Sequence, residues 1–259
     1  MTRPDSTELV HIKYSHMTWL RAFIHNGGEF FACRLITSAD DPRGPGPAIS
    51  KTLQAGITMY DGCSIEQPPP VMHDETFVVL GGMVRILTGD NYSRSIEARP
   101  GDVLWLPKGA FWRFEGEKGS IFYVAYPGDP RMRTPAAPTD GPSPEVLHLR
   151  SQEMVFSQIH LRSGGLASSC RLITPEISKT LSVDIHTYDD CSIETTAACD
   201  EAIVVLEGAL RILTGDNYSR VIEAKFSDVI LVPRGVQLKY QGDKAKVFHV
   251  AHPPLRHAQ

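Results

Sequence analysis

Short runs of hydrophobic residues, separated by turn-forming residues, recur along the whole chain. In the first half these runs occupy residues 76–80 (TFVVL), 83–87 (MVRIL), 102–106 (DVLWL) and 120–126 (SIFYVAY). Runs of this length that are rich in β-branched and aromatic residues predict strands. Helical periodicity is confined to short pieces, so the pattern predicts an all-β sandwich or barrel.

The same pattern of strands occurs twice. Residues 85–94 (RILTGDNYSR) return unchanged at 211–220. Further shared words keep their order, because CRLIT, ISKTL and CSIE each occur once in either half, at offsets that fall from 137 to 128. Ordered matches at a nearly constant offset indicate a duplicated structural unit. We interpret the Gly-Asp-Asn of the longest repeat as a hairpin turn, with Arg85 and Arg94 on an exposed face.

The first copy carries insertions that the second copy lacks. The falling offset places nine extra residues within 40–47 and its neighbours, and two more around residues 68–70. Residues 127–144 contain six prolines and predict an extended linker. We therefore predict an N-terminal barrel at 1–126, a linker at 127–144 and a C-terminal barrel at 145–259.

Composition excludes several classes of partner. The formal net charge of −4 and the pI near 6.2 do not suggest the basic face that nucleic-acid binding needs. No apolar run approaches the roughly 18 residues of a membrane-spanning helix, and the first residues lead into no apolar signal region. We therefore expect a cytoplasmic protein without nucleic-acid or membrane partners. Because barrel edges can pair between subunits, we also expect a homodimer.

The five cysteines form no CxxC pair, which gives no support to a zinc ribbon or a thioredoxin-like site. Four of them belong to the repeated words, and Cys199 is the fifth. We expect reduced thiols in a barrel wall. The alternative for Cys199 is a nucleophile, which would need a lowered pKa.

Two motifs in each copy resemble those of the cupin superfamily. The first is a glutamate and a glycine separated by six residues, and the second has the spacing glycine, proline, glycine and histidine. The matching residues are Glu75, Gly82, Gly101, Pro107 and Gly109 in the first copy, and Glu201, Gly208, Pro233 and Gly235 in the second. The resemblance covers nearly the whole chain. It implies a bicupin, two tandem jelly-roll (double-stranded β-helix) barrels, and within the superfamily it is closest to ethanolamine-utilisation cupins.

The histidines that hold a metal in cupins are missing from both copies. The early pair falls on prolines or Val71 in the first copy and on Thr195 and Ala197 in the second. The late histidine is replaced by Trp112 and Leu238. A cupin metal needs about three imidazoles beside the glutamate, and one carboxylate cannot replace them. The departures therefore predict that the usual four-ligand metal site is absent, and they leave the cofactor unknown.

Candidate chemistry in the first copy gathers around its glutamate. Alternate residues of a strand face the same side, so His73 faces the lumen if Glu75 does, as its cupin counterpart does. An imidazole beside a carboxylate in an apolar barrel suits proton transfer. We predict His73, Glu75 and Tyr60 as catalytic residues, with Trp112 and Tyr123 in contact with substrate. The alternative is a solvent-facing His73 in a loop after the prolines.

The second copy offers another set of polar residues. Tyr188, His186 and Glu201 are its candidates for substrate binding, and His249 is a further possibility. Since the first copy has both a neighbouring histidine and a tryptophan, we expect the first barrel to be the active one if only one works.

Three classes of function remain open, all with a small-molecule ligand. The first is a lyase or isomerase that uses acid/base residues in a barrel lumen, and it leads narrowly. The second is a metal-dependent oxygenase with an unusual ligand set, in which His73 and Glu75 bind the metal. The third is a non-catalytic ligand-binding bicupin. The sequence does not identify the substrate.

Overall fold

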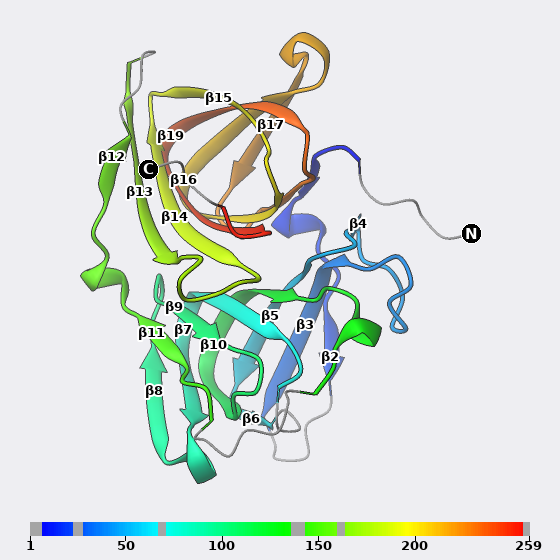
Figure 1. Cartoon of the computed structure of the whole chain (residues 1–259), viewed down its shortest axis with the longest axis vertical. Helices are drawn as coiled ribbons and strands as arrows, with labels where there is room; N and C mark the ends of the chain where they lie inside the picture. Colours follow the sequence, from blue (N-terminus) through cyan, green and yellow to red (C-terminus); the bar gives the residue numbers. More distant parts are fainter. Residues whose placement is uncertain (1–6, 23–27, 67–70, 136–142, 160–163, 256–259) are drawn as a thin grey trace.

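Two stacked β-barrels make up the computed structural model (Figure 1). It describes residues 7–22, 28–66, 71–135, 143–159 and 164–255. No helix in these ranges is long and apolar enough to cross a membrane. Helical structure in them consists of five single turns of 3₁₀ helix: η1 (Tyr14–His16), η2 (Asp90–Tyr92), η3 (Pro130–Met132), η4 (Ser151–Glu153) and η5 (Asp216–Tyr218).

The first barrel is a sheet that contains ten of the described strands. They are β2 (Leu20–Ala22), β3 (Glu29–Thr37), β4 (Ala48–Ile49), β5 (Gln54–Asp61), β6 (Cys63–Glu66), β7 (Asp74–Thr88), β8 (Arg94–Ala98), β9 (Val103–Leu106), β10 (Trp112–Tyr126) and β11 (Leu147–Leu149). The main path of neighbouring strands is β11-β9-β7-β10-β5-β3-β2.

The second barrel repeats this order with nine described strands. They are β1 (Val10–Ile12), β12 (Ser157–Ile159), β13 (Leu166–Ile173), β14 (Ser182–Asp189), β15 (Ser192–Thr196), β16 (Asp200–Thr214), β17 (Arg220–Lys225), β18 (Val229–Val232) and β19 (Gln237–His252). Its path, β1-β18-β16-β19-β14-β13-β12, matches the first strand for strand. The predicted all-β fold of two tandem jelly-roll barrels is confirmed.

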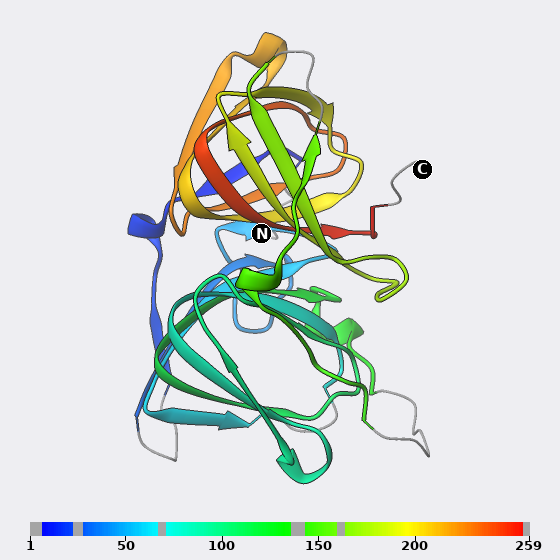
Figure 2. The same cartoon turned by 90° about the vertical axis from the view of Figure 1, so that its left-hand side faces the viewer.

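Each barrel is completed by a short strand from the other half of the chain. The N-terminal β1 pairs with β18 of the second barrel, and β11 pairs with β9 of the first. Figure 2 shows the N-terminal segment lying against the C-terminal barrel before the chain descends to the other one. The division at 126 and 145 stays our proposal for the duplicated unit, while residues 10–12 and 147–149, the exchanged arms, lie in the opposite sheets.

Matched hydrogen bonds hold the two exchanged arms in the same way. His11 Nε2 lies 3.0 Å from Asp228 Oδ2, and His148 Nε2 lies 3.0 Å from Asp102 Oδ2. The other oxygen of each aspartate accepts a backbone N–H at 2.8 Å from the residue two positions beyond the arm, Tyr14 or Ser151. Because these carboxylates are nearly buried, the bonds replace water that the arms exclude.

The two barrels share one hydrophobic core between them. Residues from both halves pack into a single buried cluster, in which the rings of Phe122 and Phe248 meet edge to face with centroids 6.2 Å apart. Two further clusters fill the two lumens. A continuous core of this kind fixes the barrels relative to each other.

The predicted strands at 76–80 and 83–87 are one continuous strand, β7. The glycines between them do not form a turn; they bend the strand over its neighbour β10. Gly82 has a φ of 65°, and a Cβ there would lie 2.0 Å from the carbonyl oxygen of Lys118. The hairpin predicted in the longest repeat is present, since η2 joins the antiparallel pair β7 and β8. The prolines at 68–70 and residues 136–142 of the predicted linker lie outside the described residues.

Candidate functional site

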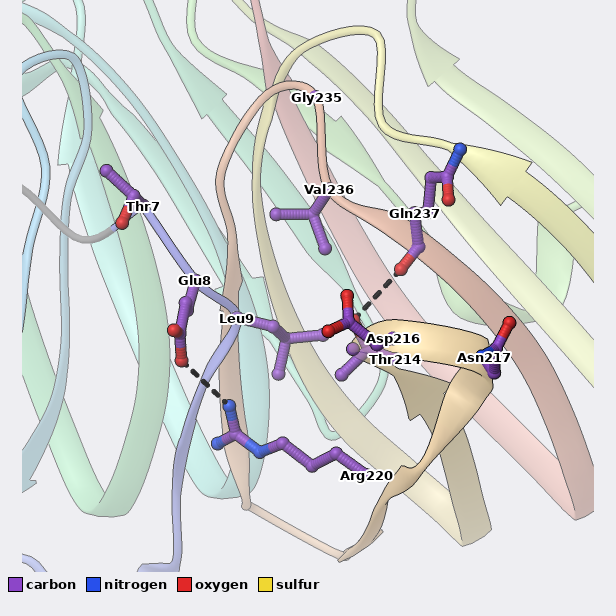
Figure 3. A pocket seen from close by; sticks show the side chains of 11 residues that line it. Thr7, Glu8, Leu9, Thr214, Asp216, Asn217, Arg220, Gly235, Val236 and Gln237 are labelled. Carbon is purple, nitrogen blue, oxygen red and sulfur yellow. Dashed lines mark hydrogen bonds and ion pairs between the residues drawn. The ribbon is translucent and has the colours of Figure 1, made fainter.

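A hollow of about 840 Å³ lies where the N-terminal segment meets the hairpin turn of the second barrel (Figure 3). Glu8 and Arg220 form an ion pair on its wall, with Oε2 and a guanidinium nitrogen 3.5 Å apart. Its described lining contains no histidine, cysteine or tyrosine. It therefore offers no imidazole, thiol or phenol, the groups that most often transfer protons or bind transition metals beside a carboxylate.

The lumen of the first barrel holds a second cavity, of about 440 Å³. The structure brings all five residues predicted for this barrel to its wall: Tyr60, His73, Glu75, Trp112 and Tyr123. They come from β5, β7 and β10, and from the residue immediately before β7. Three neighbouring strands therefore converge on one polar cavity in an otherwise aromatic and aliphatic lumen.

His73 and Glu75 form a buried pair in this cavity. His73 Nε2 lies 3.0 Å from Glu75 Oε2, and the two residues are 7% and 8% exposed. The alternation expected of a strand holds here, although His73 stands just before β7. The alternative of a solvent-facing His73 is therefore excluded. A carboxylate at this distance holds the imidazole in one orientation.

The aromatic residues of the cavity offer hydrogen-bond donors. Burial raises the pKa of Tyr60 far above its usual value and that of Tyr123 to about 12, and Glu75 adds to both effects. The Tyr60 hydroxyl accepts a hydrogen bond of 3.0 Å from Thr58 Oγ1. Trp112 Nε1 is buried and has no hydrogen-bond partner among the described residues. A ligand that accepts from this N–H would remove the cost of leaving it unpaired.

Three arginines that the sequence did not reveal also line the cavity. Arg34 lies in β3, Arg43 in the inserted segment at 40–47, and Arg133 just after η3 in the predicted linker. Two of the three thus come from parts of the first copy that the second copy lacks or does not repeat. The insertion was visible in the sequence, and a loop present in only one of two copies is a signal of function.

The charges around these arginines do not balance. Buried Asp41 accepts hydrogen bonds from Arg34 at 3.2 Å and from Arg43 at 3.1 Å. Arg133 donates to the Gln54 side chain and to the backbone oxygen of Pro127 at 3.1 Å, and no described carboxylate forms a salt bridge with it. Burial lowers the pKa of Arg133, but an arginine side chain stays charged in proteins. The cavity therefore carries excess positive charge.

The second barrel also pairs its glutamate with an imidazole, from a different position. His249 Nε2 lies 3.1 Å from Glu201 Oε2, which also accepts a hydrogen bond of 3.2 Å from the Tyr240 hydroxyl. Burial alone would lower the pKa of His249, but Glu201 and Asp184 outweigh it and raise the pKa. The predicted binding residues His186, Tyr188 and Glu201 lie in this same lumen, and the rings of the first two stack with centroids 6.0 Å apart.

The cysteines agree with the structural interpretation. All five are free and buried. Burial raises the pKa of Cys199, and the nearby Glu201 raises it further. A raised pKa keeps the thiol protonated, so the alternative of a nucleophilic Cys199 loses its physical basis.

Comparison with known proteins bears on the family and the fold. Residues 164–255 match the family described as ethanolamine utilisation protein EutQ. No curated protein matches the chain. The matched segment covers the second barrel from β13 through β19.

Several solved structures share the whole two-barrel architecture. A putative glyoxylate induced protein from Pseudomonas aeruginosa is 14% identical, with a TM-score of 0.71 over 99% of this chain and 92% of that one. Protein Ylba from E. coli is 12% identical, with a TM-score of 0.68 over 97% and 93%. A variant of oxalate decarboxylase from Bacillus subtilis is 16% identical, with a TM-score of 0.64 over 99% and 80%.

At these identities the likeness shows the fold alone, two tandem barrels of the cupin type. Together with the family match over residues 164–255, it supports the resemblance to the cupin superfamily, and the matched barrel resembles EutQ-type cupins. The early histidine positions of the motif fall on Thr195 and Ala197, and the late one on Trp112 and Leu238, both of which are buried in the lumens.

Proposed function

We propose that the protein is an enzyme, a lyase or isomerase, that acts on a small carboxylate by acid/base chemistry in the lumen of the first barrel. The observation that carries this proposal is the buried pair of His73 and Glu75 at 3.0 Å, on the wall of a cavity of about 440 Å³. The same wall carries three guanidinium groups. Proton transfer and anion binding are thus available side by side.

The arginines support the assignment of an anionic substrate. Arg133 is the guanidinium without a carboxylate partner among the described residues, and it lies in the field of Glu75 and Tyr123. A substrate carboxylate would pair with it, since guanidinium and carboxylate form two parallel hydrogen bonds. Positive charge beside the carboxylate also stabilises the negative charge that develops when a proton leaves the adjacent carbon.

His73 serves as the general base in this proposal, with Glu75 as its partner. With Nε2–H donated to Glu75, the neutral ring keeps its lone pair on Nδ1 for proton abstraction. The imidazolium that forms is stabilised by the carboxylate. Tyr60 and Tyr123, which their raised pKa values keep protonated, donate hydrogen bonds to the leaving group or to the developing oxyanion. The His73 imidazolium then returns its proton to the leaving group or to another substrate carbon, which completes an elimination or an isomerisation.

The test is proton exchange in D₂O with a panel of small hydroxy and keto acids, followed by proton NMR. The wild-type chain should exchange a carbon-bound proton of at least one acid or convert it to product. Glu75→Gln and His73→Gln should abolish the exchange and keep the fold, as judged by circular dichroism. Glu97→Gln is the matched control, because Glu97 lies on the outer strand β8 and pairs with Arg85.

Binding separates this function from a ligand-binding bicupin. If calorimetry shows that a carboxylate binds at the cavity but no acid exchanges or reacts, the protein is a binding module. Exchange that survives both substitutions would contradict the proposal, because the proton would then be moved by other groups.

A further inference from the structure

Three side chains of the second lumen form a cluster with metal-ligand chemistry. Asp184 and His186 lie two residues apart on β14, and His249 lies on β19 directly across from Asp184. Their ligand atoms all lie within 4.8 Å of one another. Asp184 and His249 are buried. One carboxylate and two imidazoles therefore converge from two paired strands.

Glu201 orients the ring of His249 within this cluster. His249 Nε2 lies 3.1 Å from Glu201 Oε2, while its Nδ1 is buried with no hydrogen-bond partner among the described residues. If Nε2 carries the proton that Glu201 accepts, Nδ1 presents an unshared pair to the cluster. Metal-bound histidines in proteins commonly donate their second ring nitrogen to a carboxylate in this way.

We propose that Asp184, His186 and His249 bind a divalent transition-metal ion in the second barrel, with Glu201 as the residue that positions His249. Two imidazoles select transition metals over Mg²⁺ and Ca²⁺, which prefer oxygen ligands. Three protein ligands leave coordination positions for water or a small ligand. This site is independent of the proton-transfer site in the first barrel.

The ligand set stands apart from the cupin motif. The motif histidines would fall near Thr195 in β15, near Ala197 just after β15, and at Leu238 at the start of β19. The proposed ligands lie on β14 and late in β19 instead. The lumen therefore combines the motif glutamate with ligands that the motif does not include.

The first barrel supplies an internal comparison. At the matching positions it has Gly56, Thr58 and Tyr123, which do not form such a cluster. Gly56 and Tyr123 are packed together, since a Cβ on Gly56 would lie 2.9 Å from the Tyr123 hydroxyl. The cross-strand pair of Asp184 and His249 therefore occupies the place that Gly56 and Tyr123 hold in the first barrel.

The experiment uses the full chain, freed of metal with a chelator and titrated with Mn²⁺, Co²⁺ or Zn²⁺. We expect about one ion per chain by calorimetry and elemental analysis, and a visible absorption band with Co²⁺. Asp184→Asn and His249→Gln should weaken binding at least tenfold, and Glu201→Gln about tenfold. The triple variant Asp184→Gly, His186→Thr and His249→Tyr should bind none.

Control variants make each outcome decisive. His16→Gln removes an exposed histidine and should retain the ion. His73→Gln should retain it as well, because His73 lies in the other barrel. Failure of the wild-type chain to bind any of the three ions overturns the proposal. Retention of the ion by the triple variant overturns it too, and so does loss of the ion in His73→Gln. The visible absorption band of Co²⁺ is measured on the wild-type chain, so this part of the test does not depend on whether a variant folds.

Discussion

The two barrels hold the same glutamate and pair it with imidazoles from different places. In the first barrel His73, just before β7, lies 3.0 Å from Glu75. In the second barrel His249, from the neighbouring strand β19, lies 3.1 Å from Glu201. The carboxylate therefore lies at the same position in both barrels, whereas its imidazole partner comes from a different position in each.

The surroundings of the two pairs have opposite charge. The first lumen has gained guanidinium groups from the insertion and the linker, whereas the second has the carboxylate of Asp184 beside its pair. Excess positive charge favours an anionic ligand, and excess negative charge favours a cation. One duplicated frame thus supports two different binding chemistries, an acid/base site and a metal site in our proposals.

The largest effect on activity is expected when His73 of the first barrel is replaced by cysteine, the residue at the matching position of the second barrel. His73→Cys copies Cys199, so the fold has already accepted cysteine at this place. Without the imidazole, turnover of the carboxylate substrate should fall by about 10²- to 10⁴-fold, the usual contribution of a positioned acid or base. Steady-state kinetics on the acid identified by exchange measures the loss.

The reciprocal change, Cys199→His, should create no activity. Among the described residues the second lumen has no counterparts of Arg43 and Arg133, so we expect a second Glu–His pair there to have no anion site beside it. Equal activity in His73→Cys and wild type would contradict this prediction. It would show that the pair of His73 and Glu75, like that of His249 and Glu201, has a structural role and no catalytic one.

The next effect in size concerns the charge of the first lumen. Arg133→Gln removes the guanidinium that has no carboxylate partner among the described residues. We expect carboxylate binding to weaken by about 10- to 100-fold, the equivalent of a charged hydrogen bond of roughly 1.5–3 kcal/mol. Calorimetric titration with the carboxylate measures it. Metal binding in the second barrel should not change, and a matched loss of both would contradict the independence of the two lumens.

Much of the fold could be predicted from the sequence, because repetition doubles every signal. The strands of the longest repeat and its hairpin recur, and their spacing sets two barrels. The exchange of arms could not be predicted, since strands as short as 10–12 and 147–149 contain no information about which edge they join. The alternation of residues in a strand shows which side chains share a face, but it does not show which other strand the strand pairs with.

The candidate site was predictable where it follows strand alternation. His73 and Glu75 share a face for that reason. Arg43 and Arg133 could not be placed, because long side chains from loops reach a lumen only through the tertiary path of the chain. Asp184 was not among the residues predicted from the sequence, although the matching position in the first copy is a glycine, Gly56. A charged residue in one copy where the other copy has glycine is the signal that would have identified it.

A smaller effect tests the exchanged arms, where the two halves agree instead of differing. Asp102→Asn and Asp228→Asn each remove the carboxylate that holds an arm, and each should cost about 1–3 kcal/mol of unfolding free energy. Because the bonds match in length, the two losses should be similar. Denaturant unfolding measures both losses. A large loss of unfolding free energy in only one variant would contradict the expected equivalence and show that one arm contributes most of the stability.

The pH dependence of the Asp102 variant has a definite sign. Burial raises the pKa of Asp102, but the amides of Ser151 and Arg99, together with His148, outweigh it, so the folded pKa lies below its ordinary value. The stabilisation is therefore complete at neutral pH and is lost as the pH falls through the folded pKa. The difference in stability between wild type and Asp102→Asn should shrink below about pH 4.

The smallest effect is expected at the hairpin turns, where the copies are identical in sequence. Arg94 pairs with Glu145 at 2.5 Å and Arg220 with Glu8 at 3.5 Å, all on exposed surface. Exposed pairs contribute little, so Arg94→Ala and Arg220→Ala should each lower Tm by at most about 2 °C. Salt at about 0.5 M should remove even this difference, because it screens surface charges. A larger drop in one variant would mean that its turn has taken on a role that the other copy lacks, as the two lumens have done.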